Sequence, residues 1–349
     1  RIKMKNKILK YSILAAIIIL SIVQVGCTKE LQMVSDSTYM LGTYLQLSVW
    51  TTNKQEGMDT IKSSFERIKE IENKMSTNLD ESEIGQINLN AGKTYVEVSE
   101  ETVDIIERAI HYAELTNGAF DPAIGKLVKL WGIGTENERI PTQDEIQNAL
   151  QFVDYQKIEF QGDNKVKLSE ADMRIDLGGI AKGYAADEVT KIMKNKGIKH
   201  AIINLGGNVV TLGKKADGTS WKVGIQDPFE PTGTHMGVIE VYDQTVVTSG
   251  NYERYFMADD KRYHHIIDPK TGYPAENGII SATIITNSST DADGLSTSIY
   301  VLGVEKGMQL IESLENVECI IITEDKKVYT STGLTERFQI IDSSFQIEN

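Results

Sequence analysis

One stretch of the chain combines acidic and hydroxyl side chains at helical spacing. In "STDADGLSTSIYVLG", residues 289–303, a helix would place Asp293, Ser296, Thr297 and Tyr300 on one face and apolar side chains on the opposite face. A carboxylate and a hydroxyl one turn apart can converge on one hard cation or on one phosphate. Helix capping by the first Ser, Thr or Asp residues explains the same pattern without any ligand.

A second candidate site is the glycine-containing segment "RIDLGGIAKGYAAD", residues 174–187. A strand is expected to end at Asp176, two glycines follow, and a helix opens with Lys182. Exposed backbone and a cation at a helix N-terminus suit a diphosphate. The segment matches neither of the standard nucleotide-binding glycine motifs. A plain strand-to-helix turn with a solvated lysine remains the alternative, and "NLGGN", residues 204–208, is another turn of this kind.

Histidines cluster once in the chain, in "YHHIIDPKTGYP", residues 263–274, soon after the polar segment "TSGNYERY", residues 248–255. His264, His265 and Asp268 are the residues there that could move a proton. There is no HExxH motif and no Cys/His cluster, which argues against a zinc site. The other three histidines have no motif around them and are interpreted as structural.

The composition restricts the classes of ligand. The formal net charge is −14 over 349 residues, and such an acidic protein should repel nucleic acid and anionic lipid headgroups. We therefore expect no nucleic-acid partner. An anionic ligand would need a local source of positive charge, such as a metal ion, a lysine or a helix N-terminus.

The N-terminus has the pattern of a secretory signal. Four lysines precede the apolar run "YSILAAIIILSIVQV", which ends at Gly26-Cys27. A small residue before a cysteine is typical of bacterial lipoproteins, so we expect residues 1–26 to be removed and Cys27 to carry the lipid, for example palmitate. Residues 27–38 would form a tether, and the body would lie outside the cytoplasm, anchored to the inner membrane. An uncleaved anchor helix is the alternative. Lipidation of Cys27 would leave Cys319 as a single cysteine in an apolar strand, where it is expected to be buried.

The remaining chain predicts an α+β fold, mainly antiparallel sheets packed with helices, in a single catalytic domain over residues 39–349. Strands are expected at "TYMLGTYLQLSVW" and "MRIDLGG", and "KIEFQGDNKVKLS" has the pattern of a hairpin. Apolar residues recur at helical spacing over residues 58–75, 101–115 and 180–197. No repeat or linker divides the chain.

Taken in order, eight segments resemble the FAD:protein FMN transferase family, also called the ApbE family, with its T-fold-like architecture. They extend from about Tyr39 to Ser331 and read "MLGTY", "GAFDPAIGKL", "DLGGIAKGYAAD", "NLGGN", "VGIQDP", "TSGNYERY", "HIIDPKTGYP" and "DADGLSTSIYVLG". Each is weak alone, whereas all eight in this order are specific.

The resemblance implies a set of site residues. FAD would contact Met40, Ala119, Phe120, Asp121, Asp176, Lys182, and Ile266 or Ile267. A Mg²⁺ ion would be held by Asp293, Thr297 and a main-chain carbonyl that we assign to Gly179, with Ser296 close to this set. One position departs from the family pattern: many relatives carry an aromatic residue, usually Tyr, where Asn78 stands.

The implied reaction transfers FMN from FAD to a protein. A Thr or Ser hydroxyl of the target would attack the FMN-side phosphorus, and AMP would leave. His265 is our candidate for the base, oriented by Asp268, with His264 as the alternative. The target would be a membrane or extracytoplasmic redox protein. Two other functions stay open: an FAD pyrophosphatase that yields FMN and AMP, and a carrier lipoprotein that only binds flavin.

Replacing Cys27 by serine tests the lipoprotein signal. Cys27→Ser should abolish acyl labelling and leave the protein unprocessed or released from the membrane, because serine offers no thiol for the lipid. Fractionation and labelling of cells that express either form would measure this. Unchanged labelling and equal membrane retention would contradict the lipoprotein interpretation.

Overall fold

A computed structural model describes residues 30–348 of the chain. The predicted signal peptide and the predicted lipidation site, Cys27, lie outside these residues. Among the described helices, none is both long enough and apolar enough to cross a membrane.

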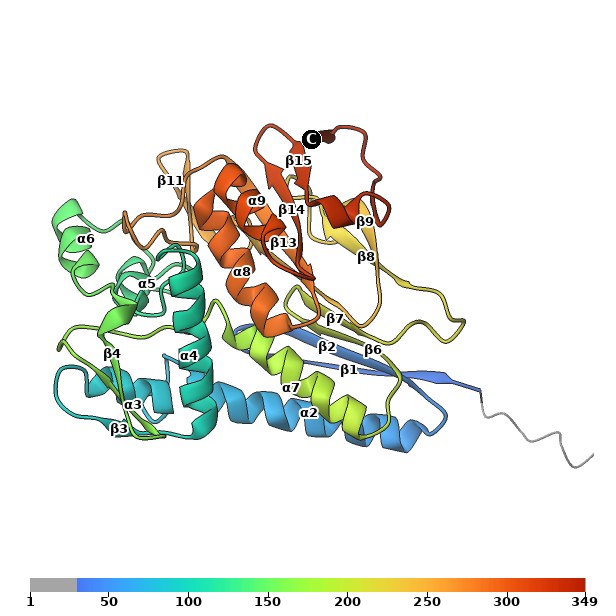
Figure 1. Ribbon diagram of the computed structural model, residues 1–349, viewed down its shortest axis with the longest axis horizontal. Helices are drawn as coiled ribbons and strands as arrows, with labels where there is room; N and C mark the ends of the chain where they lie inside the picture. Colours follow the sequence, from blue (N-terminus) through green and yellow to red (C-terminus); the bar gives the residue numbers. More distant parts are fainter. Residues whose placement is uncertain (1–29, 349) are drawn as a thin grey trace, which may run out of the picture.

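A nine-stranded sheet forms the centre of the described structure (Figure 1). Neighbouring strands in it are antiparallel, except that the last two run parallel. In spatial order they are β1 (Gln32–Met40), β2 (Thr43–Thr51), β6 (His200–Leu205), β7 (Asn208–Leu212), β10 (Thr245–Gly250), β13 (Ile279–Thr286), β14 (Glu318–Thr323), β15 (Lys327–Thr330) and β17 (Gln346–Glu348).

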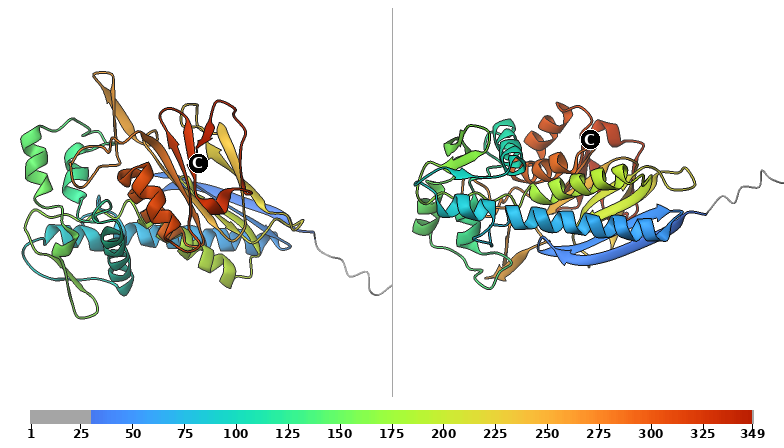
Figure 2. Two further views of the ribbon diagram at one scale, coloured as in Figure 1. Left: turned by 45° about the horizontal axis from the view of Figure 1, so that its top comes forward. Right: turned by 90° about the horizontal axis from the view of Figure 1, so that it is seen from below.

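Both faces of this sheet are covered. One face carries four helices, α2 (Lys54–Met75), α7 (Ala181–Asn195), α8 (Ser289–Leu302) and α9 (Val304–Glu312), which Figure 2 shows from two further directions. The other face packs on a three-stranded sheet of β8 (Trp221–Gln226), β9 (His235–Val241) and β16 (Phe338–Ile340). All eight residues of the central strand β13 are buried as a result, which explains why its sequence, IISATIIT, contains no charged residue.

A lobe of shorter elements completes the described part of the chain. It contains helices α3 (Glu83–Leu89), α4 (Glu100–Leu115), α5 (Gly125–Trp131) and α6 (Gln143–Leu150), and a small sheet of β3 (Val96–Glu97), β4 (Ile158–Gln161) and β5 (Lys165–Leu168). The separate hairpin β11 (Tyr255–Ala258) and β12 (Lys261–His264) packs beside it, and short 3-10 turns lie at Tyr155–Lys157 and Thr332–Leu334. One hydrophobic cluster runs from α3 and α4 through α7 to β6 and β14, so the fold is a single α+β domain, as predicted.

Three local predictions were wrong. Residues 32–38 pair with β2 along their whole length, so the expected tether over residues 27–38 is too long. The segment predicted as one strand over residues 38–50 is a hairpin, because Leu41 and Gly42 both have positive φ, as a tight two-residue turn requires. "MRIDLGG" makes only one isolated bridge, from Arg174 to Ile124, and lies along a loop.

A partly buried charge cluster joins three helices. Arg67 of α2 donates to Glu101 of α4 and to Glu188 of α7, and Glu101 also accepts from Lys74 and from Tyr184. Burial by itself would raise the pKa of Glu101, but the hydrogen bonds from Arg67, Lys74 and Tyr184 outweigh it and lower the pKa to about 2. The ionised carboxylate therefore stabilises the packing of α4 against α2 and α7.

This cluster makes stability depend on pH. The pKa of Glu101 is lowered from 4.5 to about 2, so its contribution is fully present above pH 4.5 and is lost as the pH falls toward 2. Glu101→Gln should lower the free energy of unfolding by about 1–3 kcal/mol at pH 7, after allowance for solvent screening. The difference from the wild type should shrink in urea unfolding experiments at lower pH. Glu107→Gln changes the same charge at an exposed position of α4 and should have little effect; equal losses in both variants would contradict the assignment.

Candidate active site

Helices α7 and α8 cap each other. The N-cap residue of α7, Ile180, has no side-chain acceptor, and the N–H of Gly183 instead donates to Oδ2 of Asp293 on α8, at 2.9 Å. In return, Asp187 of α7 accepts from the N–H groups of Ser289 and Thr290 in the first turn of α8, at 2.8 and 2.9 Å. Carboxylates at helix N-termini satisfy unpaired N–H groups and favour the helix dipole. The two acidic residues thus fix the relative position of the two motifs.

Glycine at position 183 permits this close approach. A Cβ atom there would lie 2.1 Å from the carbonyl oxygen of Ser289 and 2.8 Å from Cβ of Asp293. Any other residue would push α8 away from α7. The glycines of "DLGGIAKGYAAD" therefore serve helix packing as well as exposing backbone.

The residues predicted to form a metal-binding face do share one helix, α8, but they are more buried than the sequence suggests. Asp293, Ser296 and Tyr300 are as buried as the apolar residues of the helix, and only Thr297 of this face is half-exposed. The expected contrast between a polar and an apolar face is absent because sheet strands and neighbouring helices enclose α8. Among residues 30–348, Oδ1 of Asp293 accepts no hydrogen bond, whereas Oδ2 caps α7.

Hydroxyl groups gather next to Asp293. Oγ of Ser249, at the end of β10, lies 2.8 Å from Oγ of Ser296 and 3.3 Å from Oγ1 of Thr297. Ser296 also donates to the backbone carbonyl of Asp293, so its hydroxyl is engaged within the protein. Of the two predicted hydroxyls, Thr297 is therefore better placed for a ligand than Ser296.

Gly179 lies against the same cluster. A Cβ atom on it would meet the ring of Phe120 at 2.9 Å and Oγ1 of Thr297 at 3.5 Å. Its loop runs beside the loop that contains Phe120, since the N–H of Asp176 donates to the carbonyl of Pro122 and the N–H of Gly125 to that of Arg174. The two segments predicted to bind FAD are thus adjacent.

Cations adjoin this cluster. Lys182, the second residue of α7, is half-buried, forms no ion pair within residues 30–348, and lies 3.4 Å from Oδ1 of Asn208 in the "NLGGN" turn. Lys182 and Arg254 both act electrostatically on His265. Within residues 30–348 neither cation forms an ion pair, although the carboxyl group of Glu253 is near enough to act electrostatically on both. Two such cations in an acidic protein favour an anion-binding site.

His265 is held as a neutral imidazole. Its ring is half-buried, and Nδ1 lies 3.2 Å from the carbonyl oxygen of Arg254, which can only accept, so Nδ1 carries the proton and Nε2 keeps its lone pair. Burial, and then the charge of Arg254, lower its pKa to about 3. His264 is different: it is buried, Nε2 faces the carbonyl of Ala275 and Nδ1 accepts from the N–H of Ile266. This leaves His264 with a structural role.

Asp268 does not orient His265, contrary to the prediction. Its carboxylate accepts from the N–H of Lys270 and its backbone closes the turn to Gly272. The carbonyl of Arg254 takes the orienting role, because the hairpin β11–β12 brings residues 254 and 265 opposite each other.

The other residues expected near FAD differ in exposure. Ala119, Phe120, Asp121, Ile266 and Ile267 are buried, and the Asp121 carboxylate accepts from the N–H groups of Ala123 and Tyr155. Burial raises the pKa of Asp121 to about 6 despite these bonds. The side chain therefore holds the loop together. Asp176 is half-buried and accepts from the N–H of Gly178.

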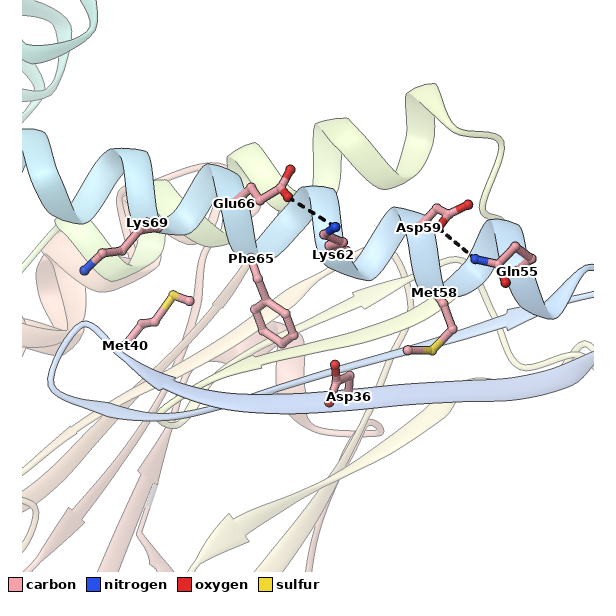
Figure 3. Close-up of a pocket in the computed structure, with 9 residues that line it drawn as sticks. All are labelled: Asp36, Met40, Gln55, Met58, Asp59, Lys62, Phe65, Glu66 and Lys69. Atoms are coloured by element: carbon pink, nitrogen blue, oxygen red, sulfur yellow. Dashed lines mark hydrogen bonds and ion pairs between the residues drawn. The ribbon is translucent and has the colours of Figure 1, made fainter.

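Met40 lies in a groove between β1 and α2, shown in Figure 3. The groove has a volume of about 620 Å³, and the side chains of Met40, Met58 and Phe65 form its apolar part. None of the residues around Asp293 lines it. Asn78, where the family resemblance led us to expect an aromatic residue, is exposed in the loop after α2 and offers no ring for stacking.

The donor set suits a hard cation that keeps water and substrate oxygens as ligands. The described residues contain no group of three or more His, Cys, Asp or Glu side chains that could hold a metal by themselves. One carboxylate oxygen and one hydroxyl beside a cationic pocket fit Mg²⁺, which usually binds through one or two carboxylates together with phosphates. They do not fit zinc.

Comparison with known proteins identifies the family. The family model described as "ApbE family" matches residues 41–321. The chain belongs to the ApbE family. Curated relatives named "FAD:protein FMN transferase" include one from Treponema pallidum, 36% identical over 90% of this chain and 91% of the relative, and one from Klebsiella pneumoniae, 38% identical over 81% and 88%.

Solved structures of ApbE proteins have the same fold. The ApbE protein from Thermotoga maritima is 35% identical with a TM-score of 0.80, and covers 87% of this chain and 98% of its own. The flavin transferase ApbE from Vibrio cholerae is 28% identical with a TM-score of 0.79, and covers 88% and 99%. The predicted family and fold are therefore confirmed.

Sequence reasoning missed several residues of this ApbE site. Ser249 and Arg254 lie in "TSGNYERY", which was singled out without roles for its residues, and Asp187 ends the glycine segment. The spacing of the motifs gives no sign that Asp187 caps a helix more than 100 residues away. Only the packing of α7 on α8 reveals it.

The two capping carboxylates should differ in their effect on stability. Asp187→Ala leaves two backbone N–H groups and the hydroxyls of Ser288 and Thr290 without their acceptor, and should lower the free energy of unfolding by about 2–4 kcal/mol. Asp293→Asn can turn its amide oxygen toward Gly183 and should cost less than about 1.5 kcal/mol. Urea unfolding would measure both. A larger loss in Asp293→Asn than in Asp187→Ala would contradict reciprocal capping as described.

Proposed function

We propose that this chain transfers the FMN part of FAD to a Thr or Ser hydroxyl of a target protein and releases AMP. The observation that carries the proposal is the closeness of Asp293, Thr297 and Gly179 to one another and to Lys182, which forms no ion pair in the described part of the chain. It occurs in a chain that resembles curated FAD:protein FMN transferases over most of its length.

The metal would be held by Oδ1 of Asp293, Oγ1 of Thr297 and the main-chain carbonyl of Gly179. When bound, Mg²⁺ supplies charge neutralisation and orientation at the phosphates of the substrate. The buried Oδ2 of Asp293 is fixed by Gly183, so the other oxygen of the same carboxylate is held in place before a ligand arrives.

The residues of the chain bind the diphosphate and orient it. Lys182 and the N-terminus of α7 attract the phosphates. Phe120, packed on Gly179, keeps water from one side of this pocket. Phosphoryl transfer depends mostly on such positioning and charge neutralisation.

His265 takes the proton of the attacking hydroxyl at Nε2. The hydroxyl oxygen forms a bond to the FMN-side phosphorus, the bond from this phosphorus to the oxygen of the AMP phosphate breaks, and AMP leaves. The pKa of His265 is lowered by burial and by the cations Arg254 and Lys182. An anionic diphosphate beside these cations offsets their charge, so substrate binding raises the pKa of His265 and makes it a stronger base.

The location and the target complete the proposal. Lipidation at Cys27 anchors the enzyme outside the cytoplasm, at the inner membrane, and places it next to membrane or extracytoplasmic redox proteins that would use covalent FMN. A net charge of −14 argues against nucleic acid as a partner.

Covalent transfer can be measured directly. The purified protein, mixed with FAD, Mg²⁺ and a candidate acceptor domain, should give a flavin-fluorescent acceptor band that survives denaturation, and changing the acceptor Thr to Ala should erase it. Asp293→Asn should stay folded and lose more than about 90% of the transfer rate, because an amide is a poor Mg²⁺ ligand. Rapid cleavage of FAD without acceptor, and no covalent flavin with several acceptors, would favour the pyrophosphatase. Binding of FAD without any AMP release would favour a carrier.

A further inference from the structure

Asn208 has a buried side-chain donor without a partner. The residue begins β7, directly after the turn at Gly206 and Gly207, and is 0% exposed. Within residues 30–348, only Nδ2 of Asn208 and Oγ of Ser281 are buried side-chain polar atoms without a hydrogen-bond partner. The phenol of Tyr252 approaches Ser281, whereas nothing comparable approaches Nδ2 of Asn208. Leaving such a donor unsatisfied is unfavourable, so it needs an explanation.

The orientation of this amide follows from its neighbour. Oδ1 of Asn208 lies 3.4 Å from Nζ of Lys182. A lysine ammonium can only donate, so the amide must turn its oxygen toward Lys182 and its NH₂ group away from it. Exchanging the two amide atoms would place donor against donor. The unsatisfied Nδ2 is therefore a consequence of the contact with Lys182.

Positive charge near Asn208 favours an anion. Lys182 occupies the first turn of α7, a helix of 15 residues with its positive end at this point. The next residue, Gly183, is tied to Asp293, so Asn208 and Lys182 lie at the same end of the helix as the predicted metal ligands. An amide N–H donor without a partner, an ammonium group that forms no ion pair within residues 30–348, and a helix N-terminus together complement phosphate oxygens.

We propose that Asn208 binds the substrate: Nδ2 donates to a non-bridging oxygen of the diphosphate of FAD, while Oδ1 directs Lys182 to the same group. This rests on the proposed function, since the diphosphate is that of FAD. The turn "NLGGN" then has a role, because its two glycines, both with positive φ, bring β7 back so that Asn208 enters the core beside α7.

Substrate binding by three variants tests this role. In EDTA, where turnover is suppressed, the affinity for FAD should fall about 10- to 100-fold in Asn208→Ala, as expected for a lost hydrogen bond to a charged group. The affinity for ADP should fall similarly, and that for adenosine, which lacks phosphate, should not change. Ser281→Ala removes the other unpartnered atom and should leave all three affinities unchanged. The melting temperature of ligand-free Asn208→Ala should change by no more than about 3 °C, because in the free protein Nδ2 forms no bond and Oδ1 makes only the long contact with Lys182.

Replacing Asn208 by aspartate should make FAD affinity depend on pH in a way that a purely structural role would not produce. Asn208→Asp keeps the shape but pairs with Lys182 and repels phosphate, so FAD affinity should be lower than in Asn208→Ala at pH 8 and should recover as the pH falls and the carboxyl becomes protonated. In a double-mutant cycle with Lys182→Met, the two losses should be less than additive, because Asn208 acts partly through Lys182.

The outcomes separate this inference from the proposed function. Unchanged FAD and ADP affinity in Asn208→Ala would overturn the role of Asn208, even if FMN transfer is observed. Equal losses for ADP and adenosine would also overturn it, because they would show a general collapse of the pocket. Weakened ADP binding together with no FAD cleavage by the wild type would support the phosphate contact and contradict the proposed function. Failure of the wild type to bind either nucleotide would overturn both.

Discussion

The site depends on the reciprocal capping of α7 and α8. Asp187 satisfies the first turn of α8, and Asp293 satisfies the first turn of α7. Helix N-termini carry unpaired N–H groups and a partial positive charge, so two helices that begin close together and cross would repel each other without these carboxylates. With them, the two N-termini lie together, and the motif residues on both helices point into one region. This arrangement requires glycine at position 183, because no side chain fits between the helices there.

The same arrangement explains how an acidic protein can bind an anion. One carboxylate oxygen of Asp293 is fixed by the N–H of Gly183. Lys182, the residue before Gly183, forms no ion pair in the described structure. A fixed carboxylate beside a free ammonium suits a complex of a divalent cation with a diphosphate, in which each protein group meets its opposite charge. The surrounding negative charge then acts against anions that arrive without a cation.

Burial separates structural from reactive members of the predicted motifs. His264 and Asp121 are enclosed and have all their side-chain partners inside the protein, so their places in the motifs reflect loop and strand packing. His265 and Thr297 are half-exposed, and each keeps an atom available. Adjacent histidines thus have different roles, because β12 ends at His264 and its side chain is buried, whereas His265 follows the strand and is only half-buried.

The sequence alone determined the family and the mainly antiparallel α+β class, and it supplied most of the candidate site residues. These follow from local spacing: glycines before a helix, a carboxylate and a hydroxyl one turn apart, alternating apolar residues. It could not determine contacts between distant segments. The cap from Asp187 to Ser289, the carbonyl of Arg254 that fixes the tautomer of His265, and the contact of Asn208 with Lys182 all depend on how helices and strands pack. The length of β1 and the burial of α8 likewise depend on the segments that pack against them. A polar strand or helix face is stable inside a protein only when other segments satisfy its hydrogen bonds.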